Sequence, residues 1–295
     1  MNKLMRKLSI SILAVVFAVI AMGATTFAWF TLTGTAKVSQ FEINVTSAEG
    51  IELSVVDGVW ASTIDGSVIK GLTGVSGTKL TAVSTPNGYD TFTTLTSLSA
   101  AGATTTSVAT SGSHYVDFTI NIRTRTASQS IYIDKTNTTI DSAALSWQPD
   151  IAFTIDGTTP ITKDTPAFNV YPDNSARMSF TGTSTVIYEK EAATDNNTLG
   201  MSNVWTKGAL NYYAAKNLYT PTANPTIPAY TTTVLGTANT SAITTTSGTL
   251  NEAGWATTSV VVRIWLEGWD AECYNAIFNG QLQITIGFTT VEPSA

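Results

Sequence analysis

Apolar and polar side chains alternate in three stretches of this chain, and this two-residue period constrains the fold more than any other feature. The apolar sets are Val116, Phe118, Ile120 and Ile122; Val260, Val262, Ile264 and Leu266; and Leu282, Ile284, Ile286 and Phe288. Successive side chains of a β-strand point to opposite faces, so each stretch is predicted to be a strand with one buried face. The stretch 260–266 also has Val261 and Trp265 at the intervening positions, which indicates a central strand.

Composition supports a β-rich chain. Threonine accounts for 53 of the 295 residues, and charged residues for only 12%. β-Branched side chains favour strands, and a hydrophobic content of 43% is enough to build a core. Many short strands with turn signals, and no alternation of strand and helix, predict an all-β, antiparallel, jelly-roll-like β-sandwich. Helix is expected only as one or two short turns, chiefly in 207–217, where Leu210, Tyr213 and Ala214 share a face.

Turn signals predict how some strands pair. The expected pairs are 51–55 with 59–60 across Asp57-Gly58, 116–122 with 131–133 across 127–129, and 178–180 with 186–188. Ile264 and Ile284 are expected on buried faces of adjacent or nearly adjacent strands. Asn279-Gly280 is expected to end a helical turn with left-handed backbone.

The N-terminus has the pattern of an export signal. Three basic residues, Lys3, Arg6 and Lys7, precede a stretch that has no charge until Lys37. Thr26-Phe27-Ala28 fits a small-x-small cleavage site, so residues 1–28 are interpreted as a signal peptide that a signal peptidase cuts between Ala28 and Trp29. The alternative is an uncleaved membrane anchor, because the uncharged stretch is long enough to span a bilayer. The basic residues predict export of the remaining chain in either case.

Behind the leader, we expect an extended segment, 29–45, and then a single β-sandwich domain, 46–295. Residues near 71–113 and 190–254 are rich in Thr, Ser, Gly and Ala and are interpreted as loop-rich insertions of that domain.

The residue inventory excludes several functions. One histidine and one cysteine exclude a zinc site built from several His or Cys ligands and a disulfide within the chain. The sequence has neither H-E-x-x-H nor G-x-S-x-G, so no enzyme and no cofactor is expected. A net charge of −6 argues against nucleic acid as a partner.

Three carboxylates lie close together in the sequence, namely Glu267, Asp270 and Glu272. Carboxylate oxygens are ligands that Ca²⁺ prefers, which makes this group a candidate metal site. Its spacing fits no known calcium loop. The competing interpretation is a solvated turn in which Asp270 caps a helical turn.

The segment Ala24-Thr25-Thr26-Phe27-Ala28-Trp29-Phe30-Thr31 resembles the leader junction of the TasA/camelysin family, and Trp29 to Val45 followed by Gly50-Ile51-Glu52-Leu53 resembles the layout behind it. The resemblance covers about the first fifty-five residues. It implies a secreted protein of a Gram-positive bacterium with a jelly-roll body, assembled into biofilm-matrix fibres. Camelysin is labelled a metallopeptidase, an activity that this sequence does not support because it has one histidine and no H-E-x-x-H.

In such fibres the N-terminal strand of one subunit fills an open sheet edge of the next. Here the candidate donor is Trp29 to Val45, with Phe41, Ile43 and Val45 as its inward side chains. A head-to-tail contact of this kind does not close and therefore makes a homopolymer. The alternative is that the segment is the first strand of its own sandwich.

Two other classes of function stay open. A surface adhesin or carbohydrate-binding module would need exposed aromatic side chains, and the best candidates are Trp205, Tyr212, Tyr213 and Tyr219. Its partners would be a matrix polysaccharide or other surface proteins. A secreted hydrolase would need a pair of carboxylates, and no pair stands out in the sequence.

Overall fold

The computed structural model describes residues 40–164, 168–190, 200–237 and 241–293. The leader 1–28, the expected cleavage point between Ala28 and Trp29, and the first part of the extended segment lie outside these residues. The described chain is mostly β-sheet, as predicted, with short helices. None of the helices in the described residues is long and apolar enough to cross a membrane.

The larger of the two main sheets contains eight strands. From edge to edge its order is β17 (Thr233–Val234), β16 (Thr185–Glu189), β15 (Ala176–Thr181), β19 (Ala256–Glu267), β8 (Val116–Thr124), β2 (Ile51–Val56) and β3 (Val59–Ala61), with β5 (Ala82–Val83) paired to the end of β19. β19 lies between β15 and β8, which confirms the predicted central strand.

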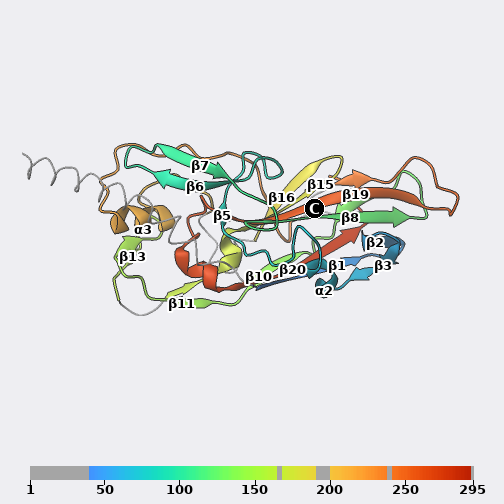
Figure 1. The fold of residues 1–295 in the computed structure, drawn as a ribbon, viewed down its shortest axis with the longest axis horizontal. Coiled ribbons are helices and arrows are strands. Elements are labelled where there is room, and N and C mark those ends of the chain that lie inside the picture. Colours follow the sequence, from blue (N-terminus) through green and yellow to red (C-terminus); the bar gives the residue numbers. More distant parts are fainter. Residues whose placement is uncertain (1–39, 165–167, 191–199, 238–240, 294–295) are drawn as a thin grey trace, which may run out of the picture.

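The second main sheet contains six strands and includes the first and the last strand described (Figure 1). Its order is β18 (Thr244–Thr245), β9 (Ser130–Ile133), β20 (Gln281–Thr289), β1 (Gln40–Ser47) and β4 (Thr63–Ile64), with β10 (Thr139–Ser142) also paired to β20.

Within the described residues, three two-stranded sheets and four short helices accompany the two main sheets. The small sheets are β6 (Thr93–Leu98) with β7 (Thr104–Val108), β11 (Leu145–Trp147) with β14 (Phe168–Val170), and β12 (Phe153–Thr154) with β13 (Pro160–Ile161). The helices are α2 (Gly66–Lys70), η2 (Pro172–Ser175), α3 (Gly208–Lys216) and η3 (Asn275–Asn279). The helix α3 confirms the helix expected in 207–217.

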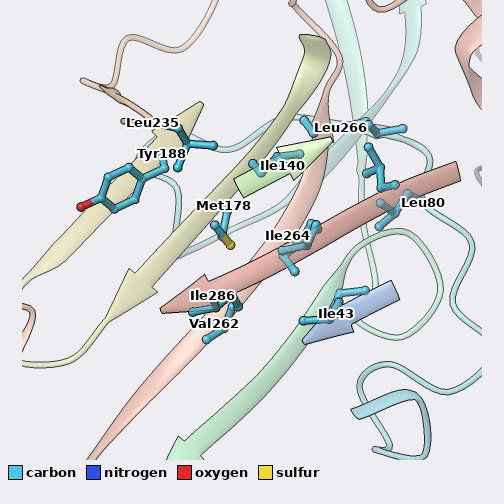
Figure 2. Close-up of a cluster of buried hydrophobic side chains, with 14 of the residues drawn as sticks. Ile43, Leu80, Ile140, Met178, Tyr188, Leu235, Val262, Ile264, Leu266 and Ile286 are labelled. Atoms are coloured by element: carbon cyan, nitrogen blue, oxygen red, sulfur yellow. The ribbon is translucent and has the colours of Figure 1, made fainter. Parts of the chain in front are cut away.

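The apolar faces of the two main sheets share one hydrophobic core, so the architecture is a β-sandwich. Figure 2 shows Val262 and Ile264 of β19 close to Ile43 of β1 and Ile286 of β20. The three alternating stretches bury the predicted residues in β8, β19 and β20. Ile264 and Ile284 are each 1% exposed, as expected, but they belong to different sheets and not to adjacent strands.

Two of the three predicted strand pairs form. β2 pairs with β3 across Asp57-Gly58, where Gly58 has φ of 80°, and β15 pairs with β16. The hairpin predicted from 116–122 and 131–133 is wrong. β8 pairs with β19 and β2, whereas β9 pairs with β20 and β18, so the chain changes sheets between them.

The expected role of Gly280 is also wrong. Its φ of −89° is not left-handed. A Cβ at this position would lie 2.4 Å from Cγ of Pro172 and 3.0 Å from Cδ1 of Leu145, so glycine is required here by the close approach of neighbouring side chains.

Candidate functional site

The first candidate site is the seam between β1 and β20. The two strands run parallel through eight residue pairs, from Gln40 opposite Gln281 to Ser47 opposite Phe288. Ile43 and Val45 are almost completely buried, at 1% and 0% exposure, as expected for the inward face of this segment. Phe41 pairs with Leu282 along the backbone. The seam therefore joins the two ends of the described chain through backbone hydrogen bonds and apolar contacts.

The other edge of β1 is covered only in part by further strand pairing. β4 pairs with two residues of β1, namely Val45 opposite Ile64 and Thr46 opposite Thr63. Beside them, the backbone N–H of Gly66 at the start of α2 donates to Oδ1 of Asn44 over 3.1 Å. A Cβ on Gly66 would lie 2.9 Å from the carbonyl oxygen of Ile43, so α2 packs closely against the strand.

A short connection links β1 to the rest of the chain. The turn 48–50 leads directly into β2, and Gly50 has the left-handed φ of 86° that the turn requires. The backbone N–H of Ala48 still donates to the carbonyl of Phe288, over 2.9 Å. On its opposite side β20 pairs with β10 and β9, so removal of β1 would open one edge of β20 to solvent or to another strand.

The second candidate site is the acidic group at the end of β19. The structure places Glu267 and Asp270 at 0% and 1% exposure, so the interpretation as a solvated turn is wrong for these two residues. Asp270 forms an ion pair of 2.6 Å with Arg177, which is fully buried on β15 and also contacts Glu189 at 2.9 Å. Arg177 stands far from Asp270 in the sequence, inside an apolar strand, and no local pattern pointed to it.

The other two carboxylates have different partners. Glu267 accepts hydrogen bonds from the hydroxyl of Tyr230 (2.5 Å), from Nε1 of Trp265 (3.2 Å) and from the backbone N–H of Trp269 (3.1 Å). Glu272 accepts from Nδ2 of Asn174 over 2.8 Å. Each carboxylate of the group is therefore already engaged by a protein donor.

Burial dominates the electrostatics of this group. It raises the pKa of Glu267 and of Asp270 above the usual carboxyl range, and the cationic Arg177 opposes the rise at both. For Glu272, burial and then the charge of Asp270 raise the pKa to about 8. Within the residues that the structure describes, no cluster of three or more His, Cys, Asp or Glu side chains could hold a metal ion. The group acts as a buried polar network around Arg177.

The third candidate site is the aromatic group proposed for sugar binding. The structure buries three of its members, since Trp205, Tyr212 and Tyr213 are 5%, 6% and 2% exposed, so their predicted exposure is wrong. Their polar atoms have partners inside the protein: Nε1 of Trp205 donates to the carbonyl of Ala223 over 2.7 Å, and the hydroxyl of Tyr213 donates to that of Leu98 over 3.0 Å. These rings are part of the core around α3.

An open pocket of about 620 Å³ lies beside this aromatic group. Trp205 and Tyr219 form part of its wall, with the polar side chains of Asn211, Thr222 and Asn224. Apolar and amide groups of this kind suit a neutral polar ligand such as a sugar.

Two half-buried tryptophans are covered by arginine. The guanidinium of Arg123 lies 4.4 Å from the ring centre of Trp60 and 4.0 Å from that of Trp255, and Arg125 lies 3.5 Å from Trp255. Cation–π contacts of this kind stabilise the end of the sandwich and occupy ring faces that a sugar would need.

Comparison with known proteins adds no relative. No family model matches the chain, and neither a curated protein nor a solved structure matches it.

Proposed function

We propose that this chain is an exported structural protein of the extracellular matrix or cell surface, which polymerises into fibres when the segment 29–45 of one copy completes a sheet of the next. The observation that supports this best is the parallel pairing of β1 with β20. β1 is the first strand described, Ile43 and Val45 on its inward face are buried, and only the turn 48–50 separates it from β2. The leader pattern supports export.

The same contacts serve either arrangement. When a strand at one end of a chain pairs with a distant strand, the identical set of contacts forms within one copy or between two, as in domain swapping. Exchange between copies leaves each subunit with one filled edge and one donated strand. Such an assembly is open and grows into a filament. The resemblance of residues 24–55 to TasA/camelysin proteins, with the jelly-roll body it implies, is in line with this arrangement.

The second candidate function is a monomeric surface module that binds a matrix polysaccharide. The pocket beside Trp205 and Tyr219 favours it. A glycan array separates the two functions, because a fibre subunit needs no sugar ligand, whereas a binding module should retain specific glycans and lose them when Asn224 is replaced by Ala.

Deletion of residues 29–45 tests the proposed function. The shortened chain should fold with an open edge on β20 and should form no filaments in negative-stain images. A peptide with the sequence of 29–45 should then bind that edge and raise the melting temperature by mass action. Filaments that persist after the deletion would refute donation by this segment. Failure of the shortened chain to fold would show that β1 belongs to its own sandwich.

Processing is tested separately by N-terminal sequencing of the extracellular protein. We expect the mature chain to begin at Trp29, immediately after Ala28. A membrane-bound chain that still begins at Met1 would establish the anchor alternative.

A further inference from the structure

The hairpin of β6 and β7 forms a separate two-stranded sheet along the upper side of the molecule in Figure 1. One of its faces packs on the body through Leu95 and Leu98, which are 6% and 1% exposed. The other face carries hydroxyl side chains that bond across the strands. These contacts join Thr94 to Ser107 (2.8 Å), Thr96 to Thr105 (2.8 Å) and Ser97 to Thr105 (2.7 Å).

The pairing of β6 fixes the direction of the backbone groups of β7. The backbone N–H and C=O of Thr93 are both hydrogen-bonded to Ser84, so they point away from β7. Val108 lies opposite Thr93 in the antiparallel pair, and its N–H and C=O therefore point away from β6. The backbone N–H of Ala109 donates to Phe92, which fits the same alternation. Thr106 and Thr104 lie two and four residues before Val108 on the same strand. All three residues therefore direct their N–H and C=O groups outward, away from β6.

This outer edge of β7 is longer than the edges of the two main sheets, and no strand of the described residues pairs with it. The strands at the edges of the two main sheets are short: β3, β4, β5, β17 and β18 have two or three residues each, and β10 has four, which is how natural sheets limit pairing at their edges. β7 has five residues, all exposed, and no further strand pairs with it among the described residues. No charged residue occurs from Thr91 to Ser113, so the usual edge lysine or glutamate is missing as well.

We propose that β7 is a self-association edge, at which the β7 strands of two copies pair antiparallel about Thr106 into a four-stranded sheet. The outward groups are symmetric about this residue, because Thr104 then faces Val108 of the second copy and Thr106 faces its own equivalent. Each such pair exchanges two backbone hydrogen bonds. Between them Thr105 faces Ser107 of the second copy on the hydroxyl face, which extends the ladder of Thr and Ser contacts.

A second copy of this chain is a compatible occupant of this edge. The strand is uncharged, so its own copy places no like charges opposite one another, and the contact is two-fold and closes on itself. It is therefore distinct from the head-to-tail contact of β1 and does not depend on it. Where filaments form, this contact would join two of them side by side.

Charge-swapped variants test the pairing on the full chain. In the proposed register residue 105 of one copy faces residue 107 of the other. Two copies of the Thr105→Lys/Ser107→Lys variant should therefore repel each other, and so should two copies of Thr105→Glu/Ser107→Glu. Both positions are exposed, and equal melting temperatures of the two variants will show that each is folded. Sedimentation should show that the parent chain self-associates. The association constant should fall at least tenfold in each variant alone, and association should return in an equimolar mixture of the two variants.

The outcomes separate this inference from fibre formation. If each variant still forms single filaments that no longer pair sideways, both ideas hold, and if no form of the chain makes filaments while the charge swap still governs dimerisation, only the fibre proposal fails. Self-association of the lysine variant equal to that of the parent would overturn the inference. Loss of association in both variants without recovery in the mixture would also overturn it, because another segment would then occupy the edge.

Discussion

Val45 of β1 lies directly opposite Ile286 of β20 in a parallel pair, and both side chains are completely buried. Nearly the whole described chain separates the two residues in sequence. The contact joins the first described strand to the last, so the sheet is completed only when one end of a chain reaches the other. That end comes either from the same copy or from a neighbour, and the proposed function depends on which one supplies it.

The first prediction concerns the core between the sheets. Replacement of Ile264 by Asp places an unpaired charge at a site that is 1% exposed and should destabilise the fold by about 4 kcal/mol or more. Ser259→Asp on the same strand is the matched control, because Ser259 is exposed and its variant should change the stability by less than about 0.5 kcal/mol. Urea unfolding measures both. Equal midpoints for the parent chain and Ile264→Asp would contradict the assignment of this face to the core.

The second prediction concerns the buried ion pair. Arg177→Met leaves Asp270 charged, buried and without its cation, which should cost about 3–5 kcal/mol of unfolding free energy. Arg177→Met combined with Asp270→Asn removes both charges and should recover at least half of that loss. A double-mutant cycle in thermal unfolding measures the coupling. Additive losses would mean that the two side chains do not interact.

The third prediction concerns pH. Since the folded state raises the pKa of Glu272 to about 8 from an ordinary 4.5, folding binds a proton between these two values. The contribution of this group is therefore fully present below about pH 4.5 and is lost as the pH rises to about 8. Glu272→Gln mimics the protonated carboxyl, so the variant should not lose this contribution to the unfolding free energy as the pH rises. The contribution is about 1–3 kcal/mol after allowance for the partial exposure of the side chain.

Thermal unfolding between pH 5 and pH 9 checks the third prediction. Asp270 and Glu267 remain in both proteins, so the difference between the two curves isolates Glu272. The variant should become more stable relative to the parent as the pH rises. Parallel curves would show that Glu272 is ionised in the folded protein at neutral pH.

Local pattern was enough to identify strands but not always their partners. The alternation in β8, β19 and β20 shows which side chains are buried, because strand geometry alone dictates the period. The same pattern in β8 and β9 suggested a hairpin. In the fold β9 pairs with β20, more than a hundred residues later, and the apolar face of β9 would suit either partner.

The polar features show the same limit. Glu267 ends β19, and a glycine and a tryptophan separate it from Asp270, which reads locally as an exposed turn. The burial of both carboxylates depends on Arg177 and Tyr230 from distant parts of the chain. Likewise, Trp205 and Tyr213 are covered by segments around Ala223 and Leu98 that no spacing in the sequence connects to them. The inward face of β1 at Ile43 and Val45 followed from alternation, but alternation says nothing of which copy receives the strand.

A disulfide between β1 and β20 distinguishes the two arrangements directly. Glu42 and Gln283 are exposed and lie opposite each other in the parallel register, within the spacing of neighbouring strands that a disulfide can bridge. The natural Cys273 is 2% exposed and should not compete. The measurement is a non-reducing gel of the oxidised Glu42→Cys/Gln283→Cys chain, with each single variant as its control.

If β1 is donated to the next copy, this double variant should run as a ladder of covalent multimers that collapses to the monomer on reduction, while neither single variant forms a ladder. If the engineered thiols are consumed and the chain nevertheless remains a monomer before reduction, β1 pairs within its own copy and the account of fibre assembly is contradicted.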